Sequence, residues 1–263
     1  MLRIGLVTDF HYSPVDYSGR RCSQGAARLG RAMAELSKLD LEHVVTLGDL
    51  IDHSGRPASE RACLAEMGGL LRTARCPVHT VLGNHDVECL DKATCLAVLG
   101  ERRRRAYYAF DHLPWRLIVL DTNFHADGSD ISPRARMSHW RENWLGQVQL
   151  AWIKRQLRAA GDRPVAIFAH ANLDPRGGEV DGLDDHNVRD CREALDIITA
   201  AGNVQVVFQG HYHRGLFNEI EGVRFITLRA GCEGASKLSA GIAFAAEDGT
   251  VHFEGLGAQR RWL

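Results

Sequence analysis

The sequence predicts an α/β fold in which two sheets pack against each other and helices cover their outer faces. Through residue 209, short apolar runs typical of buried strands alternate with stretches whose apolar residues recur at helical spacing. That alternation is the pattern of parallel βαβ units. In the last third of the chain, strand-like runs follow one another with only turn residues between them, which favours antiparallel pairing.

The individual elements follow from the same patterns. Residues 26–39, for example, place Leu29, Met33 and Leu36 at helical spacing. Near the C-terminus, turn residues such as Glu221-Gly222 separate the short strands. In chain order, we expect strand 2–8, helix 26–39, strand 43–47, helix 59–71, strand 78–82, helix 147–157, strand 164–169, helix 188–198, and strands 204–209, 216–220, 223–228, 241–246 and 251–254. There is no internal repeat and no linker, so we predict a single domain over residues 1–263.

One long irregular stretch, residues 122–144, interrupts this pattern. It contains Gly, Ser, Pro and Asp, but also His125, His139, Trp140 and Trp144. Loops of this length inside a compact domain are usually functional or disordered. Two interpretations stay open: a cap beside the functional site, or a solvated excursion whose tryptophans pack on the body of the domain.

Composition places the chain among ordinary globular proteins. Its 263 residues are 45% hydrophobic and 25% charged, with a formal net charge of −1, so no global field favours nucleic acid or anionic membranes. No apolar run approaches the roughly 20 residues that span a bilayer, and the first residues lack the pattern of a signal peptide. The seven cysteines are odd in number and form no C-x-x-C pair, which argues against a secreted disulfide framework. We therefore expect a cytoplasmic protein. Its oligomeric state is not specified by the sequence.

Polar side chains follow five of the predicted strands, at the point where each strand ends. They are Asp9 and His11, Asp49 and Asp52, Asn84 and His85, His170, and His211 and His213. In open α/β sheets, ligands bind at the carboxyl edge of the strands. Carboxylate oxygens and imidazole nitrogens without thiolate suit Mn, Fe, Zn or Co. The strand ends therefore predict a metal site.

The ordered set of motifs resembles the calcineurin-like metallophosphoesterases. The set is Asp-x-His, Gly-Asp-x-x-Asp, Gly-Asn-His-Asp, a lone His and Gly-His-x-His, and it runs over residues 9–213. The resemblance implies a four-layer α/β/β/α sandwich of two mixed sheets flanked by helices. It also implies hydrolysis of phosphate esters or anhydrides at two divalent or mixed-valence metal ions.

Matching positions to the family's pattern assigns the metal ligands. One ion is assigned to Asp9, His11, His213 and Asp49, and the other to Asp49, Asn84, His170 and His211. Residues two apart on an extended segment face the same way, so both members of Asp9-x-His11 can reach one ion. The resemblance makes Asp49 a bridge, and a shared carboxylate with a bridging hydroxide offsets the repulsion between two divalent ions about 3.5–4 Å apart.

The resemblance also implies a catalytic acid next to the ligands. His85 is assigned this role, in which it protonates the leaving oxygen after attack by the bridging hydroxide. The family pattern pairs it with Asp52, and a carboxylate on one ring nitrogen fixes the tautomer and raises the basicity of the imidazole. Asp52 as a cap of the following segment stays an alternative. We expect Asp86 to cap or orient the backbone.

Within the family, the chain looks nearest to Mn-dependent ADP-ribose/CDP-alcohol diphosphatases and to cyclic-nucleotide-type phosphodiesterases. Trp144, ahead of Gly146-x-x-Gln149, and the stretch His186-Asn187-x-Arg189 are similar to the former. Trp144, Asn187 and Arg189 are therefore expected to bind substrate.

We expect a small-molecule diester or diphosphate as the substrate, because none of the motifs contains the Lys or Arg that a monoester dianion calls for. Arg102 to Arg105 are more typical of a solvated face than of a nucleic-acid site. A phosphomonoesterase on the same metal site, or a catalytically silent scaffold on the same fold, stays open as an alternative.

Overall fold

The computed structural model describes residues 1–54, 56–131, 141–175, 184–234 and 238–259, and these form two mixed sheets. Across the first sheet the order is β11 (Val251–Gly257), β10 (Ser239–Ala245), β1 (Leu2–Val7), β2 (His43–Thr46) and β3 (Val78–Thr80). Across the second it is β4 (Tyr108–His112), β5 (Trp115–Val119), β6 (Val165–Phe168), β7 (Val204–Gln209), β9 (Val223–Arg229) and β8 (Arg214–Ile220).

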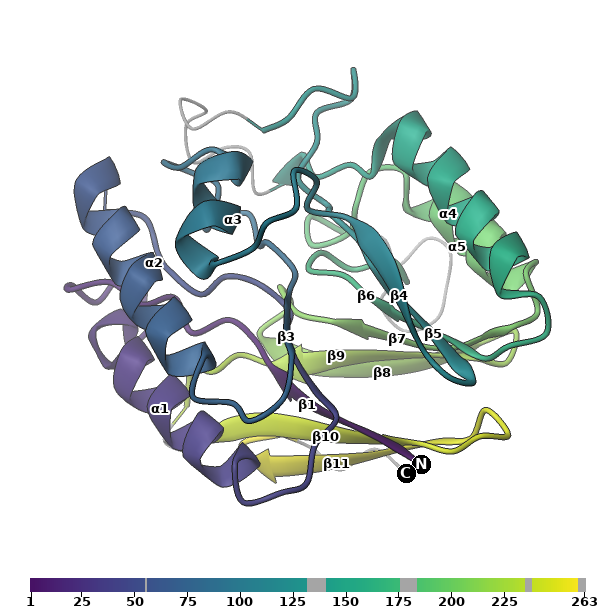
Figure 1. Cartoon of the computed structure of the whole chain (residues 1–263). Coiled ribbons are helices and arrows are strands. Elements are labelled where there is room, and N and C mark those ends of the chain that lie inside the picture. The colour runs from purple at the N-terminus through teal and green to yellow at the C-terminus, as the bar shows by residue number, and fades with distance from the viewer. Residues whose placement is uncertain (55, 132–140, 176–183, 235–237, 260–263) are drawn as a thin grey trace.

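The helices lie outside the two sheets (Figure 1). They are α1 (Gly25–Leu36), which follows the short 3-10 helix η1 (Cys22–Gln24), then α2 (Pro57–Leu71), α3 (Lys92–Leu99), α4 (Gly146–Ala160) and α5 (Cys191–Thr199). Helices α1, α2 and α3 cover the first sheet, and α4 and α5 cover the second. This arrangement confirms the predicted four-layer sandwich. Among the described residues, none of the helices has the length and apolar character needed to cross a membrane.

Three apolar clusters hold the layers together. One lies between the first sheet and its helices, and another lies between the second sheet and α4 and α5. The third joins the two sheets and contains Leu6, Val45, Phe168 and Phe208, all with at most 1% exposure. The central strands are therefore buried on both faces, which explains why their sequences are continuous apolar runs and not alternating ones.

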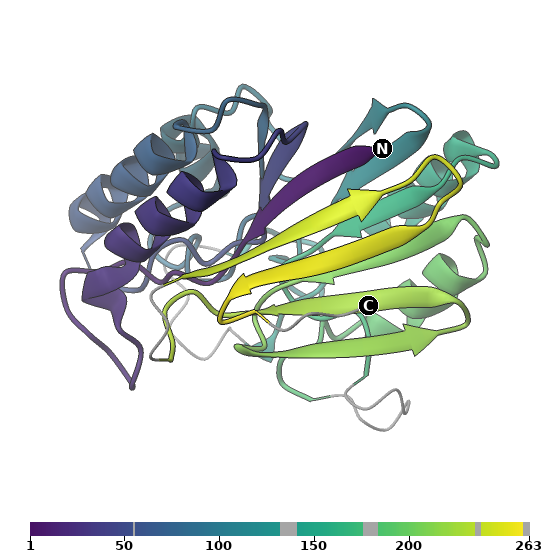
Figure 2. The ribbon, with the colours of Figure 1, turned by 90° about the horizontal axis from the view of Figure 1, so that it is seen from below.

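The last third of the chain adds two strands to each sheet. The pairs β8–β9 and β10–β11 are antiparallel, as expected. They are not one meander, however, because β9 pairs in parallel with β7 while β10 pairs antiparallel with β1. Figure 2 shows β10 and β11 in yellow beside the purple β1, with the light green β8 and β9 next to them.

Two features were absent from the expectations. The hairpin β4–β5 lies at one side of the second sheet, with β4 as the edge strand. Strand β4 contains half-buried residues without clear alternation, whereas β5 is a mostly buried apolar run that the expectations missed. Helix α3 has only eight residues, too few for a clear period, although its boundaries carry local signals. The Asp91 carboxylate accepts a hydrogen bond from Thr94 N at 2.7 Å, and Gly100 ends the helix with φ 86°.

Candidate metal centre

The predicted ligands meet where the carboxyl ends of the two sheets adjoin. In the first sheet, Asp9 N donates to Gly48 O at 3.0 Å, which places the loops after β1 and β2 side by side. In the second, Gly210 N donates to His170 O at 3.1 Å and joins the loops after β6 and β7. The two pairs of loops are connected by His211 N, which donates to the Asp9 carboxylate at 3.2 Å.

The backbone at these loops is held in an uncommon conformation. Four of the predicted ligands have left-handed φ values between 48° and 66°, namely Asp9, His11, Asp49 and His211. For residues that carry a Cβ, this conformation costs about 1–2 kcal/mol and occurs chiefly where the surrounding structure imposes it, often at functional sites. It turns side chains of consecutive loops toward a common point.

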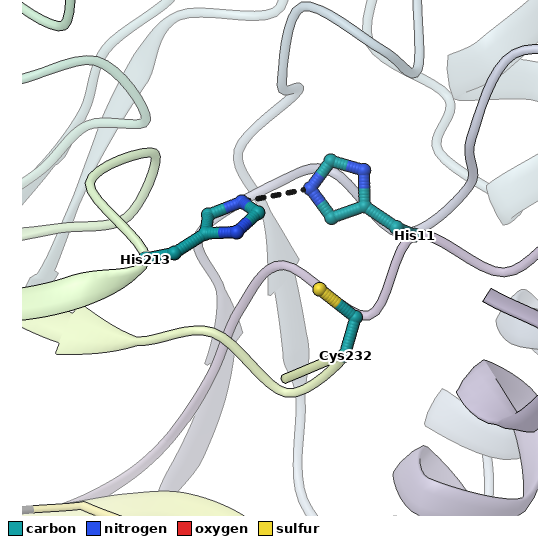
Figure 3. Close-up of side chains that lie close together, drawn as sticks. All are labelled: His11, His213 and Cys232. Atoms are coloured by element: carbon teal, nitrogen blue, oxygen red, sulfur yellow. Dashed lines mark hydrogen bonds between the residues drawn. The ribbon is translucent and has the colours of Figure 1, made fainter. Parts of the chain in front are cut away.

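One group of donor atoms surrounds His11. Its Nε2 lies 3.1 Å from His213 Nε2 and 3.4 Å from Asp49 Oδ2. Asp9 Oδ1 lies 3.8 Å from the same nitrogen and 3.5 Å from His213 Nε2. Figure 3 shows the two imidazoles with their nitrogens pointing at each other. Atoms that can each donate a lone pair converge here, which is the arrangement of ligands around a cation.

A second group adjoins the first. His170 Nε2 lies 3.1 Å from Asn84 Oδ1 and 3.3 Å from Asp49 Oδ2. The ring of His211 lies 4.9 Å from that of His170, and donor atoms of Asp49, His170 and His211 are all within 4.8 Å of one another. The same oxygen of Asp49 therefore faces both groups. Its other oxygen accepts a hydrogen bond from His85 N at 2.9 Å.

Glycine is required at two positions because the loops pass close to the carboxylates. A Cβ on Gly83 would overlap the carboxylate and amide of Asp49. A Cβ on Gly210 would overlap Thr8 Oγ1 and Asp9 Oδ2. Glycine, which has no Cβ, permits this close backbone approach.

The charge states of this centre suit a cation. Burial raises the pKa of Asp9 and of Asp49, but the facing imidazoles outweigh it and hold both well below the ordinary range. Burial lowers the pKa of His11 to about 4 and that of His211 well below 6.5, so both rings are neutral at pH 7. Ionised carboxylates and neutral imidazoles are the forms that bind divalent ions.

The other two imidazoles are held by partners behind them. His170 Nδ1 lies 2.8 Å from Leu47 O, so its Nε2 points at Asp49. Burial lowers the pKa of His170 and of His213, but neighbouring carboxylates outweigh it and raise both to about 9. These two residues would release a proton on binding a cation. The donor set as a whole fits divalent ions that accept nitrogen and oxygen ligands.

His85 lies beside the donor groups, with two carboxylates on one side of its ring. Its Nδ1 is 3.2 Å from Asp52 Oδ1 and 3.3 Å from Glu88 Oε2. Burial lowers the pKa of His85, but Asp49, Asp52 and Glu88 together raise it well above 6.5. Asp52 is itself fixed, because its Oδ2 lies 2.8 Å from Arg20 Nη2. The neighbouring carboxylates therefore favour the protonated form of the ring.

The Asp86 carboxylate holds the backbone of two motifs. Its Oδ1 accepts from Leu50 N and Ile51 N at 2.9 and 3.2 Å, and its Oδ2 accepts from Gly83 N at 2.9 Å. This is the backbone-orienting role that the sequence predicted. It ties the loop after β2 to the loop after β3.

The sequence model of the calcineurin-like phosphoesterase family matches residues 2–215, which include most of the chain and all of the motifs. This chain belongs to the calcineurin-like phosphoesterase family.

Relatives of this chain include enzymes named as phosphodiesterases. It is 28% identical over 196 residues to glycerophosphodiester phosphodiesterase GpdQ of Enterobacter lignolyticus, which covers 71% of this chain and 61% of that enzyme. It is 24% identical over 202 residues to 3',5'-cyclic adenosine monophosphate phosphodiesterase CpdA of Haemophilus influenzae, covering 73% and 62%. The matched part thus spans less than two thirds of each relative.

The fold matches a solved structure over nearly its full length. A dimetal phosphatase from Danio rerio superposes with a TM-score of 0.82 at 19% identity, covering 98% of this chain and 96% of that one. At this identity the likeness establishes the fold.

Two residues around the candidate centre carried no signal in the sequence, and a third was passed over. Glu233 Oε1 lies 2.5 Å from His213 Nδ1, and Cys232 places its sulfur close to His11 and His213 (Figure 3). Both residues lie in the loop after β9, which has no recognisable motif. The ring of His186 lies 5.3 Å from that of His211. His186 belongs to the stretch His186-Asn187-x-Arg189, but only Asn187 and Arg189 were expected to bind substrate.

The residues expected to bind substrate have other contacts. Asn187 is buried, and its amide nitrogen donates to Asp174 O at 2.7 Å. Arg189 is partly exposed and lies 3.5 Å from Asp185. Trp144 is half-buried, and its backbone pairs with that of Phe124. Substrate binding by Asn187, Arg189 and Trp144 stays a prediction.

The stretch 122–144 begins next to the metal centre. Thr122 Oγ1 accepts from Ala171 N at 3.3 Å, and Asn123 Nδ2 donates to Leu82 O at 2.8 Å. Its other end is joined to the segment before α5, since Arg189 N donates to Asn143 O at 2.8 Å. Residues 132–140, which include His139 and Trp140, lie outside the described residues. The role of the stretch as a cap stays a prediction.

Proposed function

We propose that this phosphoesterase hydrolyses a small phosphodiester or diphosphate, with nucleotide-derived compounds as the leading class, at a pair of metal ions. The observation that carries the proposal is the position of Asp49. One of its oxygens lies 3.4 Å from His11 and 3.3 Å from His170, so a single carboxylate faces both donor groups. A carboxylate in this position is suited to bridge two cations.

The ligand sets proposed are those that the motifs predict. Asp9, His11 and His213 would hold one ion, Asn84, His170 and His211 the other, and Asp49 both. Mn, Fe, Zn and Co are the candidate metals. When bound, two such ions supply an ionised water for attack and neutralise charge on the phosphoryl oxygens.

We assign proton donation to His85. The side chain is 14% exposed, so it borders the solvent from which substrate arrives, while its Nδ1 faces Asp52 and Glu88 inside the protein. The opposite ring nitrogen is then free to give its proton to the leaving oxygen. Asp52 and Glu88 raise the pKa of the ring, so that it is protonated near neutral pH and takes up a proton from water again after each turnover.

The preference for diesters or diphosphates rests on charge. A monoester dianion needs a cationic side chain beside the metal ions. Among the described residues, Arg20 lies close to Asp52, the residue beside the proposed acid. The charge of Arg20 is offset by its ion pair with Asp52, in which Nη2 lies 2.8 Å from Oδ2. Arg189 lies next to Asp185. The names of GpdQ and CpdA, both phosphodiesterases, support the same preference.

The test compares substrate classes on one enzyme preparation. We would measure kcat/KM for paired p-nitrophenyl mono- and diesters, then for a glycerophosphodiester, cyclic nucleotides and ADP-ribose, each with Mn, Zn, Co and Fe. A monoester preference of tenfold or more, about 1.4 kcal/mol in barrier, would overturn the proposal and make the protein a phosphomonoesterase. Protein that holds no metal and turns over none of these compounds would indicate a catalytically silent scaffold.

A further inference from the structure

A separate cluster of metal-binding side chains lies behind His85. It consists of His53, which follows the Gly-Asp-x-x-Asp motif, Glu60 in the first turn of α2, and Cys89 in the loop after Gly-Asn-His-Asp. One nitrogen, one oxygen and one sulfur of these residues lie within 4.8 Å of one another. None of the three belongs to the proposed pair of metal sites.

Two distances from His53 are close to those between ligands on one ion. His53 Nδ1 lies 3.4 Å from Cys89 Sγ and 3.7 Å from Glu60 Oε1. Ligand atoms at two corners of a tetrahedral zinc site are about 3.3–3.6 Å apart, given Zn–N, Zn–O and Zn–S bonds of about 2.0–2.3 Å. The side chains therefore need little movement to coordinate.

Glu60 provides an independent indication of a ligand. Its side chain is 1% exposed, and its Oε1 accepts from Ser54 N at 2.7 Å. Its Oε2 is buried and has no hydrogen-bond partner among the described residues. Oε1, the oxygen nearer His53, also accepts from Ser54 Oγ at 3.2 Å. Burying a carboxylate with one oxygen unpartnered is costly, and a cation bound to the carboxylate would offset part of that cost.

We propose that His53, Glu60 and Cys89 form a third cation site, selective for Zn²⁺. The thiolate distinguishes this site from the oxygen- and nitrogen-rich donor groups around Asp49, because sulfur ligands favour Zn²⁺ over Mn²⁺. The side chain of His53 is 34% exposed, which gives the ion a path from solvent and leaves the fourth position to water.

The site is connected to the proposed acid through one carboxylate. Glu88 Oε1 lies 3.5 Å from His53 Nδ1, and Glu88 Oε2 lies 3.3 Å from His85 Nδ1. Coordination requires His53 Nδ1 to give up any proton, so in the occupied state His53 cannot donate to Glu88. Glu88 then interacts with His85 alone of these two histidines.

The test is a metal titration of the whole chain, with binding and not activity as the readout. Protein stripped with a chelator would be titrated with Zn²⁺ alone and its metal content measured. We expect the wild type to hold one more equivalent than Cys89→Ser. Cys76→Ser is the matched control, because Cys76 is also half-buried and belongs to none of the cation clusters found among the described residues. It should keep the wild-type stoichiometry.

Two further measurements identify the site. With Co²⁺ as the probe, a sulfur-to-cobalt charge-transfer band should appear in the wild type and in Cys232→Ala, but not in Cys89→Ser. Glu60→Gln keeps an oxygen for Ser54 and removes the charge, so it should fold normally and bind the last equivalent at least tenfold more weakly. Equal stoichiometry in wild type and Cys89→Ser, or a band that depends on Cys232 instead, would overturn the proposal. Failure of the metal pair around Asp49 would leave the Cys89-dependent equivalent in place.

Discussion

Glu233 holds His213 from behind, with its Oε1 2.5 Å from His213 Nδ1. The opposite ring nitrogen, His213 Nε2, consequently faces Asp9 Oδ1 at 3.5 Å. A carboxylate in this position fixes the tautomer and orientation of a metal-binding imidazole.

The first prediction concerns this carboxylate. Glu233→Gln should weaken the binding of one ion roughly 10–100-fold, as is usual for loss of such a partner, and leave the other ion nearly unaffected. Mn²⁺ titration followed by calorimetry measures this. Glu247→Gln, in the turn between β10 and β11, is the control and should bind as the wild type does. If both variants bound Mn²⁺ equally well, Glu233 would have no role in holding the ion.

The second prediction tests the shared carboxylate. Asp49→Ala should lose both ions and all activity, because Asp49 Oδ2 faces both donor groups. Asp9→Ala should lose one ion preferentially, since its carboxylate faces His11 and His213. Metal content should be measured after reconstitution with Mn²⁺. The thiol-containing site at Cys89 favours Zn²⁺ over Mn²⁺ and is therefore not counted. Near-normal metal content and turnover in Asp49→Ala would contradict the bridge, and equal loss of both ions in Asp9→Ala would indicate strongly cooperative binding.

The third prediction concerns proton donation. His85→Ala should keep its ions and lose roughly 10²–10⁴-fold in rate. The loss should be smaller for p-nitrophenol esters, whose leaving group needs little protonation, than for alkyl esters. Asp52→Asn should show a weaker form of the same pattern, because the His85 ring keeps Glu88. An equal loss on good and poor leaving groups would assign His85 to substrate binding.

The fourth prediction concerns a chain of histidines between the edges of the two sheets, in which His43 and His79 are buried and His112 is half-buried. His43 Nε2 lies 3.1 Å from His112 Nδ1, His79 Nε2 lies 3.1 Å from His43 Nδ1, and the hydroxyl of Tyr108 lies 3.3 Å from His79 Nδ1. Burial and the neighbouring His112 lower the pKa of His43 to about 4. Burial, His43 and Arg103 lower the pKa of His79 to about 3.

These shifts make the fold sensitive to acid. In the unfolded chain both rings take up a proton near pH 6.5, whereas in the folded chain they stay neutral to about pH 3–4. The unfolded state therefore binds more protons below pH 6.5, and stability falls as the pH drops through this window. From pH 7.5 to 5.0 the loss for His79 is about 2 kcal/mol.

The measurement is the free energy of urea unfolding in the presence of a chelator. His79→Gln should recover this loss, so that its stability relative to wild type improves by about 2 kcal/mol between pH 7.5 and 5.0. Because the metal-binding histidines are the same in both proteins, their contribution cancels in the comparison. A difference that did not change with pH would mean that His79 binds protons equally in the folded and unfolded chains, which would contradict the lowered pKa.

The sequence by itself determined the layers and which residues make up the candidate centre. Buried strands such as residues 204–209 are apolar throughout, and α1 carries its apolar residues at helical spacing, because burial acts on each element locally. The motif residues follow strand ends, and the carboxyl ends of parallel strands share one edge, so their convergence could be predicted without coordinates. Elements with weak local patterns, such as β4 and α3, could not.

Only the tertiary structure decided which loops meet at that edge. Asp9 and His211 are 202 positions apart, yet His211 N donates to the Asp9 carboxylate. Glu233 contacts His213, and Glu60 lies close to His53 and Cys89. No sequence motif predicts either arrangement. The packing of one sheet on the other and the left-handed turns at Asp9 and Asp49 set these positions. Such contacts depend on the summed burial of residues far apart in the chain, which no local pattern encodes.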